Sequence, residues 1–554
     1  MSKKKIVAMT LIALGMFWLG NHVTVWLRAA LPYLMATDEA TKQAGEAAAQ
    51  AALEASLPFL SFDKPDLIGG AAGIVIALLI YLYNMGSRET RAVGEEHGSA
   101  AWGTPRDLKP YSESNPAKRL SFTKTENLSL DTRKTRRNLN VCVIGASGTG
   151  KTRSYMLPNI RKADMSKAIT DPKGEIYRDT AQELQDKGYK IRAFNLVDFS
   201  QSDHFNPFVY FDPDNPETSI AQLAETIITN TSGGDMRQGK SEDFWDKAER
   251  ALLTALMAYV YVWEPSPSLV DVIDLHKDIS NKKGEKGLTD LKFEDAAALL
   301  ENGADNELNA QEKALLSYAV RQWRVYQQGS HETRQGIAIS VGVRLAPLDM
   351  ESVRNIIAND TIGLDAIGDK DDKTALYLII PDTHQTFRFL AAMFWQTFFA
   401  QTIYKADHSE GGHLATPVHV YLDEFANIGR IANFPQFMAT IRSRGLSVSL
   451  AVQNMAQGEA VWGKDWSTVV SNCDTVLFLG SRDEQTTQWV SKQLGDQTIS
   501  YQTASVSKGM HGNYTQGEQI TRRALMTPDE IATLDNNKAI TLIRGLRPFL
   551  GNKL

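Results

Sequence analysis

The stretch from Leu139 to Thr152, LNVCVIGASGTGKT, most constrains what this chain can fold into. Its apolar run, Val141–Ile144, is typical of a buried strand. The residues after the run fit the phosphate-loop pattern G-x-x-x-x-G-K-[ST]. They are Gly145, Ala146, Ser147, Gly148, Thr149, Gly150, Lys151 and Thr152. Three glycines let the backbone curl so that its N–H groups converge on phosphate. We expect a strand, a phosphate-binding loop and then a helix starting near Gly150, whose positive dipole end favours anions.

The last two residues of this loop indicate which cofactors it takes. The ammonium of Lys151 would reach the β- and γ-phosphates of a nucleotide, and the hydroxyl of Thr152 would ligate a magnesium ion. The predicted cofactors are therefore ATP and Mg²⁺.

Composition places the chain among ordinary globular proteins of more than one domain. The 554 residues are 43% hydrophobic and 22% charged, which excludes disorder as the main theme. A net charge of −6 gives no global sign of nucleic-acid binding, so any basic surface must be local. Cys142 and Cys473 both lie in apolar runs and are predicted to be reduced core residues. The histidines show no ligand spacing, so no zinc site is predicted.

Two uncharged runs near the N-terminus predict a membrane anchor. They cover Ile6–Leu27 and Leu67–Ser87, and each is long enough to cross a bilayer. Basic residues flank the outer ends of both runs, which favours a cytoplasmic location for those ends. We predict a two-helix transmembrane hairpin, residues 1–87, with a short external loop and the bulk of the chain in the cytoplasm. The alternative for the first run is a cleaved signal peptide, although its apolar core should be shorter.

Two further segments lie near this anchor. Ala36–Leu57 is rich in strong helix formers and is predicted to be a short external helix. Basic residues cluster just before the apolar run that opens the loop motif: Arg133, Lys134, Arg136 and Arg137. Such a cluster fits contact with anionic membrane lipid as well as it fits contact with DNA.

After the loop, apolar runs alternate with helical patterns. The predicted strands are Lys167–Thr170, Lys190–Leu196, Ala375–Ile380, Val418–Leu422, Leu446–Val452 and Thr475–Leu479. This alternation is typical of an α/β fold, a mainly parallel sheet covered on both faces. We assign residues 88–205 and 348–554 to this nucleotide-binding domain.

Residues 206–347 do not follow this alternation of strands and helices. Apolar residues recur there at helical spacing over Phe244–Tyr259, Gln311–Gln328 and Glu332–Leu345, with no convincing strand. This region is predicted to be an all-α domain inserted into the α/β domain. Tyr501–Gln519, rich in Ser, Gly, Thr and Gln, is predicted to be a mobile loop.

Two carboxylates, Asp423 and Glu424, directly follow the apolar run Val418–Leu422. Asp423 would hold the magnesium shell, and Glu424 could polarise the water that attacks the γ-phosphate. Gln453 ends the next apolar run and could sense the γ-phosphate or hold water. A polar residue at a strand end has an equally simple structural explanation.

Several segments together resemble one protein family. They are Leu422–Phe434 (LDEFANIGRIANF), Gly98–Thr104 (GSAAWGT), Asp171–Tyr177 (DPKGEIY), Trp245–Leu256 (WDKAERALLTAL), Ser443–Leu446 (SRGL) and Thr527–Ile531 (TPDEI). In this order they resemble the type IV coupling proteins, the membrane ATPases of conjugation and type IV secretion. The resemblance covers residues from about 95 to 547, and the predicted anchor agrees with it.

The resemblance implies a RecA-like P-loop ATPase domain, an inserted all-α domain and a homohexameric ring in the inner (cytoplasmic) membrane. Its implied partners are a relaxase–single-stranded DNA complex or effector proteins, DNA, membrane lipid and the inner-membrane components of a secretion channel. The acidic tail common in the family is not seen before Leu554, which makes the inserted region the best candidate for cargo docking.

One catalytic residue is expected to act on a neighbouring subunit. Arg442 and Arg444 end a predicted helical stretch, Phe434–Ser443, just before the run Leu446–Val452. A ring ATPase often uses an arginine from the adjacent subunit on the γ-phosphate, and the family resemblance favours Arg442. The alternative is that both arginines are solvated residues favourable to the helix dipole.

Two other functions remain open at this stage. The chain could be a receptor that docks protein cargo, with ATP serving mainly to assemble the ring. It could also be a DNA pump of the chromosome-segregation type, which shares the core but not the DEFANIG-type stretch.

Overall fold

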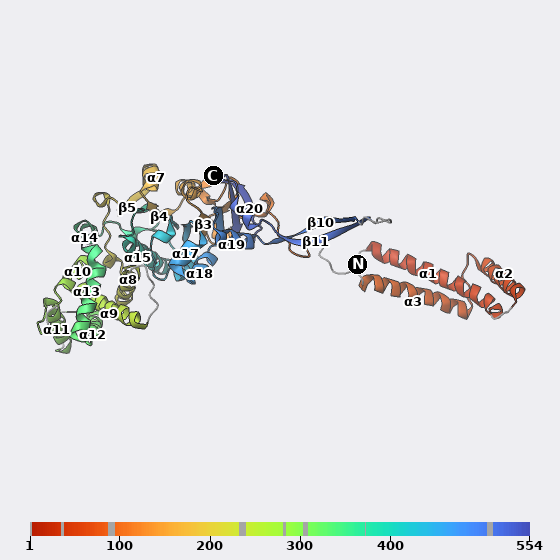
Figure 1. Ribbon diagram of the computed structural model, residues 1–554, viewed down its shortest axis with the longest axis horizontal. Coiled ribbons are helices and arrows are strands. Elements are labelled where there is room, and N and C mark those ends of the chain that lie inside the picture. Colours follow the sequence, from red (N-terminus) through yellow and green to blue (C-terminus); the bar gives the residue numbers. More distant parts are fainter. Residues whose placement is uncertain are drawn as a thin grey trace. The chain divides into compact units, whose positions relative to one another are not determined.

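The computed structural model describes residues 3–34, 38–86, 95–231, 240–280, 284–302, 308–371, 373–506 and 514–554. The chain divides into two compact units, Met1–Glu96 and His97–Leu554 (Figure 1). Each unit is described by itself.

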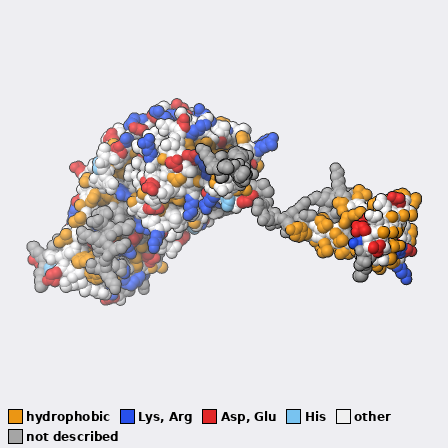
Figure 2. Space-filling model, turned by 45° about the vertical axis from the view of Figure 1, so that its right-hand side comes forward, with side chains coloured by type: hydrophobic (Ala, Val, Ile, Leu, Met, Phe, Trp, Pro, Cys, Tyr) orange, Lys and Arg blue, Asp and Glu red, His pale blue; other side chains and the backbone are white. Residues whose placement is uncertain are grey.

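The first unit consists of three helices. They are α1 (Lys3–Ala30), α2 (Glu39–Ser56) and α3 (Lys64–Gly86). Two segments are long and apolar enough to cross a membrane, as the sequence predicts: Thr10–Tyr33, which runs from α1 into the 3₁₀ turn η1 (Leu31–Tyr33), and Lys64–Tyr83 in α3. Their apolar side chains cover much of this unit's surface (Figure 2). The predicted helix over Ala36–Leu57 is confirmed as α2 in the part of it that the structure describes; Ala36, Thr37 and Ser87 lie outside the described residues.

Glycines let α1 and α3 approach closely. A Cβ atom at Gly69 would lie 1.7 Å from the Thr24 hydroxyl oxygen, and one at Gly73 would lie 2.1 Å from the Met16 carbonyl oxygen. These distances are far below van der Waals contact, so larger residues would force the two helices apart. Close packing of small residues is a main source of helix association in a bilayer, where the hydrophobic effect adds nothing. The two predicted spans therefore form one packed hairpin.

The second unit is built on a nine-stranded sheet of order β13-β12-β9-β3-β8-β7-β4-β6-β5. Its strands are β3 (Val141–Gly145), β4 (Ser166–Pro172), β5 (Lys190–Asn195), β6 (Thr374–Ile380), β7 (Val418–Leu422), β8 (Leu446–Val452), β9 (Thr475–Gly480), β12 (Lys538–Ile543) and β13 (Phe549–Asn552). The ladders from β9 to β5 are all parallel. The seven strands predicted from apolar runs are thus confirmed to within two residues, and so is the mainly parallel α/β fold.

Helices and a small hairpin cover the two faces of this sheet. Neighbouring residues along a strand face opposite ways, so Val420 joins one hydrophobic core and Tyr421 the other. The second core is closed by α6 (Leu157–Lys162), α7 (Glu175–Asp186) and the hairpin of β1 (Arg119–Ser121) with β2 (Asn127–Ser129). The first core is closed by α15 (Arg388–His408) and by the helices between β5 and β6.

The elements between β5 and β6 are helical throughout the part of that segment which the structure describes. They include α8 (Pro216–Thr231), α9 (Lys240–Trp263), α10 (Leu269–Lys277), α11 (Leu288–Glu301), α12 (Ala310–Gln327), α13 (His331–Leu345) and α14 (Glu351–Ile357). The three helices predicted there correspond to α9, α12 and α13. Their buried side chains join the same continuous core as one face of the sheet. The division at residues 206 and 347 stays a prediction.

The remaining short helices connect strands of the second unit. They are α4 (Pro105–Leu108), α5 (Thr132–Thr135), α16 (Phe434–Thr440), α17 (Met455–Trp462), α18 (Asp465–Ser471), α19 (Glu484–Leu494) and α20 (Pro528–Ala532). The predicted helical stretch Phe434–Ser443 is confirmed as α16 with the 3₁₀ turn η9 (Ile441–Arg444).

One prediction about the C-terminal region is wrong. Tyr501–Gln519 was expected to be a mobile loop, but most of it belongs to the antiparallel pair β10 (Asp496–Val506) and β11 (Tyr514–Ala524). All eleven residues of each strand are paired. The hydrogen bonds of such a ladder join backbone N–H and C=O groups, so polar side chains do not prevent it from forming. Because the segment is rich in Ser and Gln, it lacks the alternation of apolar and polar residues by which a strand is recognised. Residues 507–513 lie outside the described part.

Candidate active site

The phosphate-loop motif forms a tight curl between β3 and the next helix. A Cβ atom at Gly145 would lie 2.4 Å from the Thr149 hydroxyl oxygen, so the two ends of the curl touch. Gly148 and Gly150 have φ of 78° and 96°, a backbone region that side chains disfavour. The Ala146 amide donates to the Gly480 carbonyl at 2.9 Å, which ties the loop to the end of β9.

The helix after the loop begins with a π-helical turn, η3 (Lys151–Met156), before α6. The Lys151 side chain is buried inside the curl, where its ammonium donates to the Gly145 carbonyl at 2.9 Å. The same Nζ lies 3.9 Å from Glu424 Oε1. The Thr152 hydroxyl donates to Asp423 Oδ2 at 2.5 Å. The loop is thereby joined to the end of β7.

The carboxylates after β7 and the amide after β8 meet at the same edge of the sheet. Gln453 Nε2 donates to Glu424 Oε2 at 3.1 Å, and the Glu424 amide donates to Asp423 Oδ1 at 3.0 Å. Glu424 has φ of 49°, an uncommon conformation for a residue with a side chain. Five predicted site residues therefore lie together: Lys151, Thr152, Asp423, Glu424 and Gln453.

The strand order explains this convergence. Strands β3, β8, β7 and β4 are neighbours in that order, and they are parallel. Their carboxyl ends therefore share one edge, which is where open α/β sheets bind ligands. Asp423 and Gln453 directly follow the last residues of β7 and β8, and the phosphate loop directly follows β3.

Burial governs the charge of this site. Burial raises the pKa of Asp423, and the hydrogen bond from Thr152 opposes that rise. Asp171, at the end of β4, is also buried, and burial raises its pKa to about 6 although it accepts hydrogen bonds from the amides of Ile176 and Tyr177. Two neighbouring buried carboxylates make a site that favours a cation.

The residues present fit a magnesium ion. Asp423 offers a buried carboxylate and Thr152 a hydroxyl, and both are the oxygen donors that Mg²⁺ prefers. Within the described residues no cluster of three or more His, Cys, Asp or Glu side chains forms a metal cage. A site with few protein ligands suits an ion that keeps several waters and binds substrate phosphates.

Asp171 and Lys173 are site residues that the motif analysis did not single out. Lys173 has φ of 74° and pairs with Asp382 at 3.1 Å. The pKa of Lys173 is raised, mainly by Asp382 and to a smaller extent by Glu424. The sequence carries a signal for Asp171, because the segment DPKGEIY places this carboxylate at the end of a predicted strand.

A buried polar chain connects the three elements that carry the site. The Tyr155 hydroxyl lies 2.7 Å from Ser449 Oγ, and His419 Nε2 lies 2.7 Å from the same oxygen. Burial lowers the pKa of His419 to about 3, so its ring is neutral. The helix after the loop, β8 and β7 are thereby held in one fixed arrangement.

Arg442 is not part of this cluster. It is exposed on η9, at the amino end of β8, whereas the phosphate loop follows the carboxyl end of the parallel neighbour β3. The seven residues of β8 span on the order of 20 Å. Arg444 is held by Asp407 through two hydrogen bonds of 2.7 and 2.9 Å.

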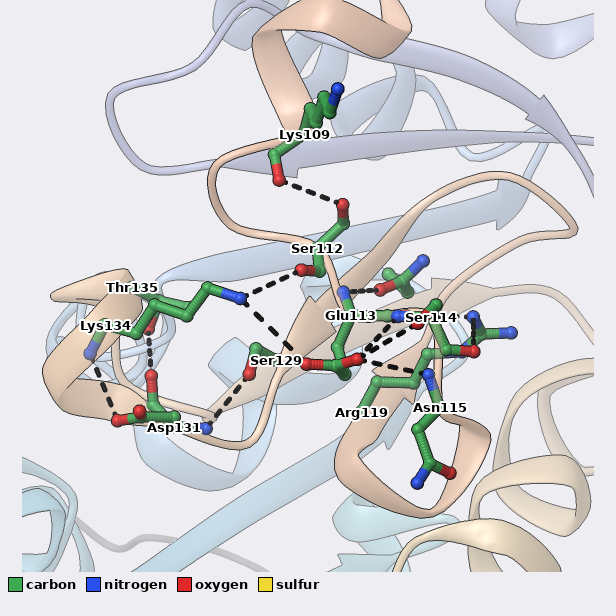
Figure 3. Close-up of polar contacts among 11 residues, drawn as sticks. Lys109, Ser112, Glu113, Ser114, Asn115, Arg119, Ser129, Asp131, Lys134 and Thr135 are labelled. Carbon is green, nitrogen blue, oxygen red and sulfur yellow. Dashed lines mark hydrogen bonds and ion pairs between the residues drawn. The ribbon is translucent and has the colours of Figure 1, made fainter.

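The basic cluster before β3 is partly engaged within the fold. The Lys134 ammonium lies 3.9 Å from Glu113 Oε2, and Glu113 in turn accepts hydrogen bonds from the amides of Ser114 and Asn115 (Figure 3). The Arg137 guanidinium donates to the Arg544 carbonyl at 2.5 Å and lies over the Tyr111 ring. Two of the four basic side chains are thus engaged in contacts within the fold, with Glu113, Tyr111 and the Arg544 carbonyl.

Comparison with known proteins agrees with this geometry. Residues 106–554 match the family model described as type IV secretory system conjugative DNA transfer. The chain is 21% identical over 421 residues to protein VirD4 of Rhizobium radiobacter, covering 74% of this chain and 55% of that protein. It is 20% identical over 412 residues to the conjugal transfer protein TraG of Agrobacterium fabrum, covering 74% and 58%. The match thus spans less than two thirds of these relatives' lengths.

Solved structures show the same fold. The unbound bacterial conjugative coupling protein TrwBdeltaN70 superposes with a TM-score of 0.59 at 16% identity, covering 83% of this chain and 94% of that one. The plasmid coupling protein TrwB in complex with ADP and Mg²⁺ gives 0.58 at 15% identity, covering 83% and 96%. The expected fold is confirmed, and with a family model matched over most of its length this chain belongs to the conjugative DNA transfer family of type IV secretion, the coupling proteins.

Proposed function

We propose that this protein is a membrane-anchored ATPase that drives a DNA-linked or protein substrate into a type IV secretion channel. The observation that carries the proposal is the joining of the phosphate loop to the carboxylates after β7, through Thr152–Asp423 and Lys151–Glu424. A receptor that only docked cargo would need no aligned base beside the loop. Family membership and the packed α1–α3 hairpin support the channel and the membrane as the setting.

We propose a step in hydrolysis for each residue of the site. Lys151 exchanges the Gly145 carbonyl for phosphate oxygens when ATP enters, because its ammonium already lies inside the curl. Glu424, oriented by Gln453, accepts the proton of the attacking water. Thr152 and Asp423 would hold magnesium, which supplies charge neutralisation of the phosphates when bound. Most of the rate then comes from positioning and charge stabilisation.

The proposed partners follow from the same setting. We place the protein in the inner membrane as a homohexamer that meets the channel's inner-membrane components, membrane lipid, DNA and a relaxase–DNA or effector substrate. The helical region between β5 and β6 is the proposed cargo-docking part. Exposed apolar side chains on its α9 and α13 support this: Phe244, Trp245, Ile339 and Val343.

The function is tested by ATPase activity of the full-length protein in lipid nanodiscs, with and without single-stranded DNA. We expect single-stranded DNA to raise turnover several-fold, because a translocating motor couples its cycle to its track. An equimolar amount of the polyanion heparin is the matched control for bulk charge. Equal turnover with DNA, with heparin and with neither would instead support a cargo receptor.

Arg442 is proposed to act on the site of a neighbouring subunit. Its position at the amino end of β8 prevents it from reaching the loop of its own chain, and it is exposed. Arg444 is held by Asp407 and is the poorer candidate. An arginine supplied from a neighbour is worth on the order of 10³ or more in rate.

Mixing two inactive variants tests this role. Arg442→Ala and Lys151→Ala subunits are each expected to be inactive alone. Mixed rings should regain ATPase activity, because some interfaces then pair an intact loop with an intact Arg442. Arg444→Ala serves as the matched control and should keep its ATPase activity when it is the only subunit present. Inactive mixed rings, with both variants assembled and Arg442→Ala still binding ATP, would contradict the role.

A further inference from the structure

Lys553 reaches the phosphate loop from the far end of the sequence. Its ammonium donates to the Thr149 carbonyl at 2.8 Å and to the Leu479 carbonyl at 2.7 Å. The first acceptor belongs to the loop itself and the second to the end of β9. Lys553 therefore joins the loop to the neighbouring strand, next to the Ala146–Gly480 hydrogen bond.

Both accepting carbonyls precede a glycine with positive φ. Gly150, after Thr149, has φ of 96°, and Gly480, after Leu479, has φ of 118°. In a planar trans peptide the C=O and the following N–H point in opposite directions. Holding the Thr149 carbonyl on Lys553 therefore turns the Gly150 amide to the other side of the loop. Without this contact the glycine leaves the Thr149–Gly150 peptide plane free to rotate, because a glycine tolerates both orientations.

The lysine is itself held firmly. It is 9% exposed, and burial lowers the pKa of its ammonium. Its amide donates to the Asn537 carbonyl at 2.8 Å, and the Lys124 amide donates to the Asn552 carbonyl at 2.9 Å. The preceding strand, β13, pairs with β12. A side chain fixed at its base by these contacts can impose an orientation on the loop.

We propose that Lys553 is a positioning residue for nucleotide binding, which fixes the Thr149–Gly150 peptide so that the loop amides face the phosphates. This inference rests on the proposed nucleotide site and extends it to the β12–β13 hairpin. The Lys553 ammonium donates to the Thr149 and Leu479 carbonyls and not to Glu424 or Gln453, so we expect its effect to fall on binding rather than on the hydrolytic step.

The test compares Lys553→Met with wild-type full-length protein in nanodiscs. Methionine keeps the length of the side chain and removes the ammonium. We expect two constants to rise about tenfold, because hydrogen bonds from a charged donor are among the stronger ones. They are the dissociation constant for a fluorescent ADP analogue in the presence of Mg²⁺ and the KM for ATP. The kcat should change less than twofold. Lys538→Met, on β12 of the same hairpin, is the matched control and should bind as wild type does.

The outcomes separate the inference from the function it rests on. If wild type itself does not bind nucleotide, the proposed function fails. If wild type binds and Lys553→Met binds equally well, the positioning role is overturned, even where the melting temperature falls. If Lys553→Met does not fold, Lys553→Gln replaces it, and an unchanged dissociation constant in that variant also overturns the proposal. A fall in kcat alone would place Lys553 in the chemical step and overturn it as well.

Discussion

Replacing Lys151 by alanine is expected to reduce ATP hydrolysis to background. The Lys151 ammonium is the charge that the curl of the loop encloses, and it lies 3.9 Å from Glu424. Its loss removes phosphate neutralisation and also leaves the Glu424 carboxylate without its cation, so both halves of the site are affected. Steady-state phosphate release from the purified protein in nanodiscs measures the change.

The matched control for this variant is Lys162→Ala. Lys162 is exposed at the end of α6, the helix that continues from the loop, so its removal changes the charge of the same element without touching the site. It should hydrolyse ATP at the wild-type rate. If Lys151→Ala keeps more than a tenth of the wild-type rate, the loop is not the hydrolytic site.

Replacing Glu424 by glutamine should slow turnover by roughly 10²–10⁴ while ATP binding persists, because a positioned general base contributes about that much. Glutamine has the same shape and can still accept the hydrogen bond from Gln453. The Lys151–Asp423–Thr152 part of the site is left in place. Single-turnover hydrolysis and nucleotide binding, measured on the same sample, separate the two effects.

Glu459→Gln makes the same chemical change on the exposed face of α17 and should leave turnover unaltered. Normal turnover in Glu424→Gln would show that another residue is the general base. A loss of nucleotide binding in step with turnover would show that Glu424 is a structural partner of Lys151 and not a base.

Much of the fold could be predicted because the central strands are fully buried. The residues of β7 and β8 are buried without exception, so apart from His419 each strand is a run of apolar and serine residues that a polar residue follows. The site could be predicted for the same reason, since Asp423 and Gln453 are the first polar residues after such runs. The order of the strands could not be predicted, because nothing local records that β8 lies between β3 and β7.

The features that the sequence did not predict have two causes, a strand too short for a periodic pattern and a contact between distant residues. Strands β12 and β13 pair antiparallel at the edge of the sheet, where β13 alternates buried and exposed residues over four positions only. That is too short for a periodic signal. Lys553 meets the loop 404 positions away. No pattern around a lysine near the chain end distinguishes it from a solvated one.

The continuous core between the sheet and the helices from α8 to α14 has a mechanical consequence. One hydrophobic interior runs from Ile144 beside the loop, through α15, to Trp323 on α12. Packed interiors are nearly incompressible and transmit strain instead of absorbing it. Within the described residues of the second unit, the sheet and these helices therefore form one packed body. In the proposed ring, a displacement generated at the nucleotide site would then reach the contacts with the neighbouring subunit.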